Sequence, residues 1–189
     1  MTHRVGEAFA IWITGLPASG KSTIAHSLLV QMNRAGFDAA ILESDHLRKI
    51  LGGQPRYDEA GRAAFYRQMA HMGASLTQHG VPVIFDATAN RRSYRAWARE
   101  HIPHLLEVYV DTPLRVCESR DPKAIYQQAR AGLIGDVPGL QVAYEPPECP
   151  DVVVHGDREA ADAAARRIMA TLAQKGYLVE SEKPLASAQ

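Results

Sequence analysis

Short apolar runs rich in β-branched residues alternate along the chain with longer segments of helical periodicity. The apolar runs predict strands at 9–14, 39–42, 81–85, 105–110 and 152–155. The segments between and after them predict helices at 21–35, 58–79, 91–101, 113–120 and 158–175. Such runs are typical of strands buried on both faces, and their alternation with helices indicates a parallel sheet covered on both sides. The pattern therefore predicts a three-layer α/β fold with a parallel five-stranded sheet.

The segment from about 121 to 150 interrupts this alternation. It combines Gly, Pro and charged residues with one short helical stretch at 124–131. A connection of this length inside a compact domain is usually functional, and we interpret it as a mobile lid. Residues 177–189 are polar, and we expect them to form a fraying tail after a single domain at 1–176.

Charge balance and cysteine content limit the function classes. The 21 Lys and Arg residues equal the 21 Asp and Glu residues in number, which argues against nucleic acid as an obligate partner. Cys117 and Cys149 form no CxxC pair and no disulfide framework, so a cytoplasmic location is the simpler interpretation. No apolar run approaches the ~20 residues of a membrane helix, and we expect no membrane partner.

The first predicted strand leads into a phosphate-binding loop. Residues 15–22 read GLPASGKS and fit the pattern GxxxxGK[ST] between a strand and a helix. The glycines let successive N–H groups point at phosphate oxygens, and the positive end of the following helix reinforces them. We expect Lys21 to reach the β- and γ-phosphates of ATP and the Ser22 hydroxyl to bind Mg²⁺. The predicted ATP-binding residues are Gly15, Ala18, Ser19, Gly20, Lys21, Ser22 and Thr23.

Acidic residues follow the predicted strands, at the edge where such sheets bind ligands. The residues expected to crowd around one cleft are Gly15, Glu43, Asp86 and Asp111. Asp45 could hold a Mg²⁺-bound water or accept the proton of an attacking hydroxyl. Alternatively, Ser44 or Asp45 caps the helix that begins there. Asp86 occupies the place of a Mg²⁺-binding acid of kinases, or it is a capping residue.

Basic residues near the same strand ends are candidate phosphate ligands. Arg48 lies one helical turn beyond Asp45, where it faces the cleft or lies in solvent. Two further groups could bind phosphate, because arginine forks and a basic lid both stabilise phosphoryl oxygens. The first group, which could instead form an exposed face, is Arg91, Arg92 and Arg95; the second, in or beside the lid, is Arg115, Arg120, Lys123 and Arg130.

From about residue 9 to 155 the chain resembles the adenylylsulfate kinases, which phosphorylate the 3′-hydroxyl of adenosine 5′-phosphosulfate. The motifs that carry the resemblance are IWITGL at 11–16, EVYVDTPL at 107–114, RDPK at 120–123 and YEPPE at 144–148. The resemblance implies a kinase fold with a phosphate-binding loop, a homodimer, ATP with Mg²⁺, and a small anionic substrate.

The resemblance also implies roles for individual residues. Asp45 is the catalytic carboxylate, acting with Lys21 of the loop and Arg120 of the lid. Arg48 and Arg62 bind the phosphosulfate, with Lys123 nearby. Ser22, Asp45 and Asp86 are the candidate Mg²⁺ ligands. Tyr57 stands where the family places the first of two aromatic rings that clamp the adenine, and Val137 stands where it places the second.

The chain departs from the family pattern around the acceptor. Val137 and Pro138 replace the F-T of the family's F-T-G-I, and Phe65 replaces an asparagine. Residues 88–90 read TAN where the family has I-S-P, and 86–92 looks more like the D-x-T-N-x-x-R of gluconate-type and polynucleotide-type kinases. Losing one ring removes about 1–3 kcal/mol of base stacking. The alternatives are therefore a kinase of another anionic hydroxyl compound and, less favoured, a nucleotide-binding module without catalysis.

Overall fold

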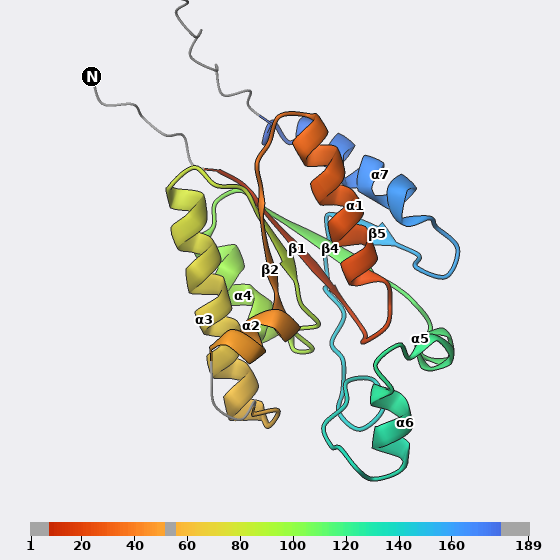
Figure 1. The fold of residues 1–189 in the computed structure, drawn as a ribbon. Coiled ribbons are helices and arrows are strands. Elements are labelled where there is room, and N and C mark those ends of the chain that lie inside the picture. Colours follow the sequence, from red (N-terminus) through yellow and green to blue (C-terminus); the bar gives the residue numbers. More distant parts are fainter. Residues whose placement is uncertain (1–7, 52–55, 179–189) are drawn as a thin grey trace, which may run out of the picture.

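A sheet of five parallel strands runs through the centre of the protein in the order β2-β3-β1-β4-β5. The computed structural model describes residues 8–51 and 56–178 (Figure 1). The strands are β1 (Ala10–Gly15), β2 (Ala40–Glu43), β3 (Val83–Asp86), β4 (Leu105–Val110) and β5 (Val152–Val154). This confirms the predicted parallel five-stranded sheet.

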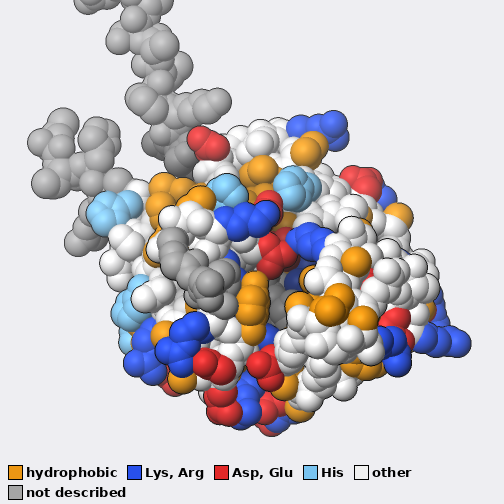
Figure 2. All heavy atoms as spheres, turned by 60° about the horizontal axis from the view of Figure 1, so that its bottom comes forward, with side chains coloured by type: hydrophobic (Ala, Val, Ile, Leu, Met, Phe, Trp, Pro, Cys, Tyr) orange, Lys and Arg blue, Asp and Glu red, His pale blue; other side chains and the backbone are white. Residues whose placement is uncertain are grey.

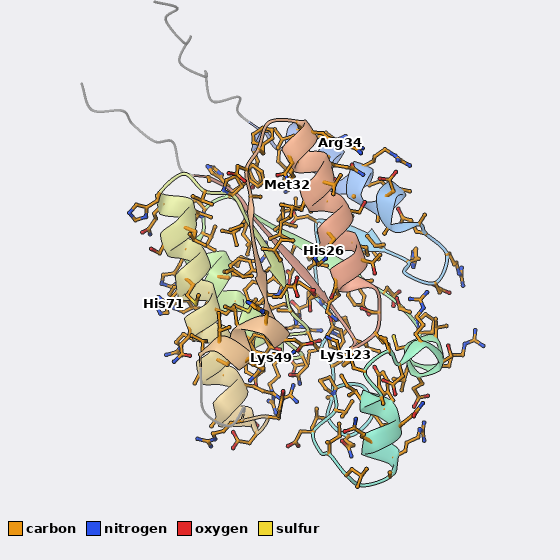
Figure 3. The ribbon with its side chains drawn as sticks, viewed as in Figure 1. His26, Met32, Arg34, Lys49, His71 and Lys123 are labelled. Atoms are coloured by element: carbon orange, nitrogen blue, oxygen red, sulfur yellow. The ribbon has the colours of Figure 1, made fainter. Side chains whose placement is uncertain are left out.

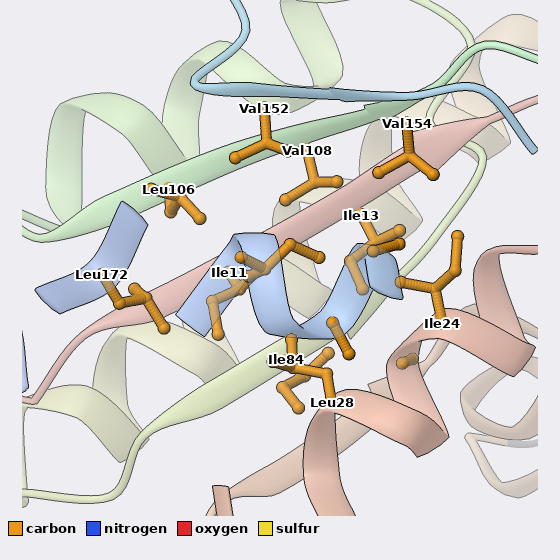
Figure 4. Close-up of a cluster of buried hydrophobic side chains, with 14 of the residues drawn as sticks. Ile11, Ile13, Ile24, Leu28, Ile84, Leu106, Val108, Val152, Val154 and Leu172 are labelled. Atoms are coloured by element: carbon orange, nitrogen blue, oxygen red, sulfur yellow. The ribbon is translucent and has the colours of Figure 1, made fainter. Parts of the chain in front are cut away.

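Helices cover both faces of the sheet, because successive residues of each strand point to opposite sides. On one face, Ile11 and Ile13 pack against α1 (Lys21–Arg34) and α7 (Ala161–Gln174), as Figures 1 and 4 show. On the other face, Trp12 packs against α3 (Glu59–Gln78) and α4 (Arg92–His101). The remaining helices are α2 (Ser44–Ile50), α5 (Leu114–Arg120) and α6 (Ile125–Arg130). The predicted three layers are confirmed.

Two predicted boundaries shift for local reasons. The third strand begins at Val83 rather than at residue 81, because the Val81 N–H donates to Leu76 O at the end of α3. The last helix begins at Ala161 rather than at residue 158, because the N–H groups of Arg158 and Glu159 both donate to His155 O in a turn. Both shifts depend on turn hydrogen bonds that hydrophobic periodicity does not encode.

The segment 121–150 packs against the phosphate-binding loop instead of standing apart from it. It contains α6 and an isolated bridge between Pro138 and Val142. A small apolar cluster, here called the lid cluster, is formed by Leu16, Cys117, Tyr126, Ala129, Val137 and Leu140. Within it, the Tyr126 hydroxyl donates to Pro17 O at 3.0 Å. Lid and loop therefore share one core.

The last two residues that the structure describes belong to the core and not to the polar tail that the sequence predicts. Tyr177 and Leu178 were expected in the polar tail, yet they pack half-buried against the core. The Tyr177 N–H donates to Leu172 O, and its ring contacts His104. Residues 179–189 of the expected tail lie outside the described residues. Among the helices of the described chain, none is long and apolar enough to cross a lipid bilayer.

Candidate active site

The phosphate-binding loop turns sharply between β1 and α1, and two glycines make that turn possible. A Cβ at Gly15 would lie 2.6 Å from Val110 O and 2.9 Å from Ser19 Oγ, so no side chain fits there. Gly20 has a φ of +109°, which side chains disfavour, and it is the N-cap residue of α1. The hydroxyl of Ser19 is buried without a hydrogen-bond partner among the described residues. The loop is thus a backbone cradle at a helix N-terminus.

Lys21 is buried at the floor of this cradle. Its Nζ donates to Leu16 O at 2.8 Å. Burial lowers the pKa of Lys21, and the nearby carboxylates of Asp86 and Asp45 oppose that shift. An anion placed in the cradle would restore favourable surroundings for the ammonium group, as the predicted contact with phosphate requires.

A cavity of about 1030 Å³ extends from the loop along the carboxyl ends of the strands. Figure 2 shows this side of the molecule, where a hollow is bordered by acidic and basic side chains. The cavity brings together most of the predicted site residues: Ala18, Ser19, Gly20, Lys21, Ser22, Thr23, Asp45, Arg48, Tyr57, Arg62, Asp86, Arg120, Lys123 and Val137. Gly15, the first residue of the loop, lies against Val110 and Ser19 and does not line the cavity.

Two acidic side chains face the cavity from neighbouring strand ends. Asp86 is buried at the end of β3, and Asp45 is exposed in the first turn of α2. Asp45 accepts a hydrogen bond from Lys123 Nζ at 2.5 Å, and this bond raises the pKa of Lys123. Lys123 reaches across from the segment between α5 and α6, below the strand ends (Figure 3). The capping alternative is wrong: Glu43 is the N-cap residue of α2, which leaves the side chains of Ser44 and Asp45 free of that role.

Arg48 and Arg62 are both buried at the end of the cavity away from the loop. The Arg48 guanidinium lies 3.7 Å from the centre of the Phe65 ring and 5.0 Å from that of Tyr57. Arg62 donates to Tyr57 O at 2.6 Å and to Asp136 O at 2.5 Å. Within the described residues, no carboxylate lies at ion-pair distance from either arginine. Two buried cations without counter-ions favour the binding of an anion at this place.

Near the loop, the predicted residue Arg120 borders the cavity together with Gly156, which the sequence reasoning missed. Arg120 donates to Gly156 O at 2.7 Å and approaches Ser19 O at 3.4 Å. A Cβ at Gly156 would lie 2.3 Å from Thr112 Oγ1 and 2.5 Å from Ser19 O, so this position excludes side chains. The cavity continues past Gly156 to Glu159. The sequence signal that could have identified Gly156 is its position directly after the predicted strand at 152–155.

Several predicted phosphate ligands lie elsewhere, so their assignment is wrong. Arg95 is buried and pairs with Glu107 at 2.8 Å, which is neither a phosphate site nor an exposed face. Arg91 pairs with Glu59 and Arg92 with Glu148 in half-exposed surface ion pairs, so for these two the alternative of an exposed face is confirmed. These partners approach from elements outside α4, so the local sequence does not reveal them. Besides Gly15, the predicted residues that are missing from the cavity lining of the described chain are Arg91, Arg92, Arg95, Arg115, Arg130 and Asp111.

Two of the residues that lie outside the cavity, Arg130 and Asp111, pair with other side chains. Arg130 pairs with Glu118 across the α5–α6 hairpin. Asp111 accepts a hydrogen bond from Tyr109 and lies 3.8 Å from His155. The cluster of basic residues that the lid sequence suggests therefore reduces, inside the cavity, to Arg120 and Lys123.

Val137 lines the cavity but contributes no aromatic ring. Its side chain is buried in the lid cluster, and Tyr57, half-exposed, lines the same cavity. At the other departure from the family pattern, the ring of Phe65 lies against the Arg48 guanidinium. Relative to the family pattern, the site therefore has an aliphatic side chain at Val137 and an additional aromatic ring, Phe65, against Arg48.

Comparison with known proteins gives a consistent result. The family model described as adenylylsulphate kinase matches residues 7–155. The adenylyl-sulfate kinase of Synechococcus sp. (strain JA-3-3Ab) is 36% identical over 89% of this chain and 96% of its own length. That of Halothermothrix orenii is 34% identical over 93% and 95%, respectively. The structure of the Mycobacterium tuberculosis APS kinase in complex with AMPPNP and APS has a TM-score of 0.84 at 32% identity, covering 88% of this chain and 98% of that chain.

Proposed function

The chain belongs to the adenylylsulphate kinase family, and from this premise we propose that it transfers the γ-phosphoryl group of ATP to the 3′-hydroxyl of adenosine 5′-phosphosulfate. The observation that carries the proposal is the distribution of charge along one cavity. Lys21 and the loop amides form an anion site at one end, and Arg48 with Arg62 forms a second at the other. A phosphoryl transfer between two anionic substrates requires two such sites.

The residues between the two sites fit the chemistry of the transfer. The 3′-hydroxyl oxygen attacks the γ-phosphorus while its proton passes to the Asp45 carboxylate. The bond between the γ-phosphorus and the β,γ-bridging oxygen breaks, and its electron pair leaves with ADP. Lys21 and Arg120 neutralise the charge that develops on the phosphoryl oxygens and on the leaving group. Lys123, which holds Asp45 at 2.5 Å, keeps that carboxylate at the junction of the two sites.

The donor set of the cavity fits Mg²⁺ as the metal that accompanies ATP. The Ser22 hydroxyl is exposed at the start of α1, and Asp45 and Asp86 border the same cavity. The described residues contain no group of three or more His, Cys, Asp or Glu ligands. Kinase sites need no such group, since Mg²⁺ there takes one or two carboxylates together with phosphates and waters. When bound, the ion would neutralise charge on the β- and γ-phosphates.

The acceptor can be tested by measuring ADP release in a coupled assay. The proposal predicts the highest kcat/KM with adenosine 5′-phosphosulfate, compared with cytidine nucleotides, uridine nucleotides and gluconate. Val137 and Phe65 favour a second candidate, a kinase for another anionic hydroxyl compound, and a strong preference for another acceptor would select it. A non-catalytic nucleotide-binding module would release no additional ADP when any acceptor is added.

Three further features belong to the proposal. We expect a homodimer, as the family resemblance implies, and light scattering after gel filtration would report its mass. We expect residues 1–176 to act as one kinase domain in which 121–150 serves as the mobile lid. The free thiols of Cys117 and Cys149 favour a cytoplasmic location, because that compartment is reducing.

A further inference from the structure

Asn90 joins the acceptor end of the cavity to the end of the lid. It lies in the loop after β3 and is only 3% exposed. Its Oδ1 accepts a hydrogen bond from Arg62 Nη1 at 3.3 Å, and its Nδ2 donates to Ala143 O at 2.9 Å. Its backbone oxygen also accepts from the Glu145 N–H at 2.7 Å. One amide side chain therefore contacts an anion-site arginine and the lid backbone at once.

The other hydrogen bonds of Arg62 extend this connection to both walls of the acceptor site. Its Nε donates to Tyr57 O and its Nη2 donates to Asp136 O. Tyr57 forms one wall of the cavity, and Asp136 precedes Val137 of the lid on the other. Because the three bonds use separate guanidinium N–H groups, they fix the plane of the fork as well as its position.

The loop that carries Asn90 is itself held firmly. Ala89 has a φ of +38°, a strained value for a residue with a side chain. The buried Arg95 guanidinium donates to Ala89 O at 2.5 Å and to Glu145 O at 2.8 Å. Arg95 in turn pairs with Glu107 of β4. The strained turn therefore presents Asn90 from a fixed support anchored in the sheet.

We propose that Asn90 is a positioning residue that orients Arg62 toward the acceptor's anion and ties residues 136–145 of the lid to that arginine. The inference rests on the proposed function only for the identity of the anion. The neutral amide is suited to both tasks, because it accepts from a cation on one side and donates to a carbonyl on the other. A carboxylate of the same shape could do only the first, and it would also neutralise Arg62.

The test compares Asn90→Asp and Asn90→Ala with the wild type. Asn90→Asp keeps an acceptor for Arg62, loses the donor to Ala143 O and adds a negative charge. Asn33→Asp on the exposed surface of α1 is the matched control, since it makes the same change of charge far from the cavity. We expect both Asn90 variants to raise KM for adenosine 5′-phosphosulfate at least about tenfold, because Asn90→Ala loses a hydrogen bond to a charged group and Asn90→Asp neutralises the arginine that binds the acceptor's anion. KM for ATP should change less than twofold.

A second readout needs no turnover. Hydrogen–deuterium exchange of the ligand-free protein should become at least about tenfold faster for the amides of 137–145 in both Asn90 variants, while exchange in α1 stays unchanged. Unchanged exchange in 137–145 would overturn the link to the lid, even in a protein that proves inactive toward adenosine 5′-phosphosulfate. Where the wild type does turn over, equal increases of both KM values would show a merely structural role and overturn the positioning role.

Two outcomes separate this inference from the proposed function. If the wild type phosphorylates another anion while the Asn90 variants show faster lid exchange than the wild type, the proposed substrate is refuted and the link between Asn90 and the lid is supported. If the Asn90 variants fail to fold, Arg62→Lys decides, because it keeps the charge but removes the fork. That variant should show the same faster exchange in 137–145, and wild-type exchange would refute the link.

Discussion

Replacing Phe65 by leucine tests how the acceptor site holds Arg48. The Arg48 guanidinium lies 3.7 Å from the ring centre of Phe65, and its hydrogen bond to Arg56 O is long at 3.4 Å. Stacking on this ring is therefore the main restraint on the guanidinium plane. A cation–π contact of this kind contributes about 0.5–2 kcal/mol.

If that restraint serves acceptor binding, Phe65→Leu raises KM for adenosine 5′-phosphosulfate about 2- to 30-fold. The ATP site lies at the other end of the cavity, so KM for ATP should stay within twofold of the wild-type value. Steady-state kinetics with each substrate varied in turn measures both effects. Phe9→Leu is the matched control, because Phe9 is a buried ring on the opposite face of the sheet and touches neither arginine.

Two results would refute this reasoning. An unchanged acceptor KM in Phe65→Leu, together with a raised one in Arg48→Ala, would show that the ring plays no part in orienting Arg48. A rise in both KM values that Phe9→Leu reproduces would show that the substitution acts through general loss of stability.

Four further predictions follow from the site and its surroundings. Lys21→Ala should abolish turnover while the thermal unfolding curve stays cooperative, and unchanged activity would refute the mechanism. Asp45→Asn should lower kcat far more than KM for ATP, whereas a pure KM effect would reassign Asp45 to binding. Gly156→Ala should raise KM for ATP and lower the melting temperature, because its Cβ would overlap Thr112 Oγ1. Wild-type values of both would show that Gly156 takes no part in ATP binding. Burial, followed by the charge of Asp111, raises the pKa of Tyr109 to about 12. The neutral phenol therefore stabilises the fold fully below the ordinary tyrosine pKa, and this contribution is lost as the pH rises through the folded pKa. In denaturant titrations across this alkaline range, Tyr109→Phe should lose less unfolding free energy than the wild type.

The sequence predicted what local patterns determine. Strands such as β1 are recognisable because Ile11, Trp12 and Ile13 are apolar on both faces, which requires burial from two sides. The loop around Lys21 is recognisable because phosphate binding needs glycines and a lysine at fixed spacing. The positions of Asp45 and Asp86 follow from the same topology, since parallel strands end at one edge.

The sequence reasoning failed where long-range pairing decides a residue's role. In the sequence, Arg95 is one of several basic residues at a helix start. In the structure it is buried and forms an ion pair with Glu107 of β4. Gly156 and Asn90 gain their importance from Thr112 and Arg62, which lie far away along the chain. Such contacts form only when distant loops come together in the folded protein, so the local sequence does not predict them.

The central claim is that this cavity phosphorylates the 3′-hydroxyl of adenosine 5′-phosphosulfate. Phosphorus NMR of the product formed from ATP, Mg²⁺ and adenosine 5′-phosphosulfate tests it directly. We predict a new phosphomonoester signal coupled to the ribose 3′ proton, with ADP formed in equal amount and none of either in Lys21→Ala. ADP formation without that signal, or phosphorylation at another position, would contradict the claim.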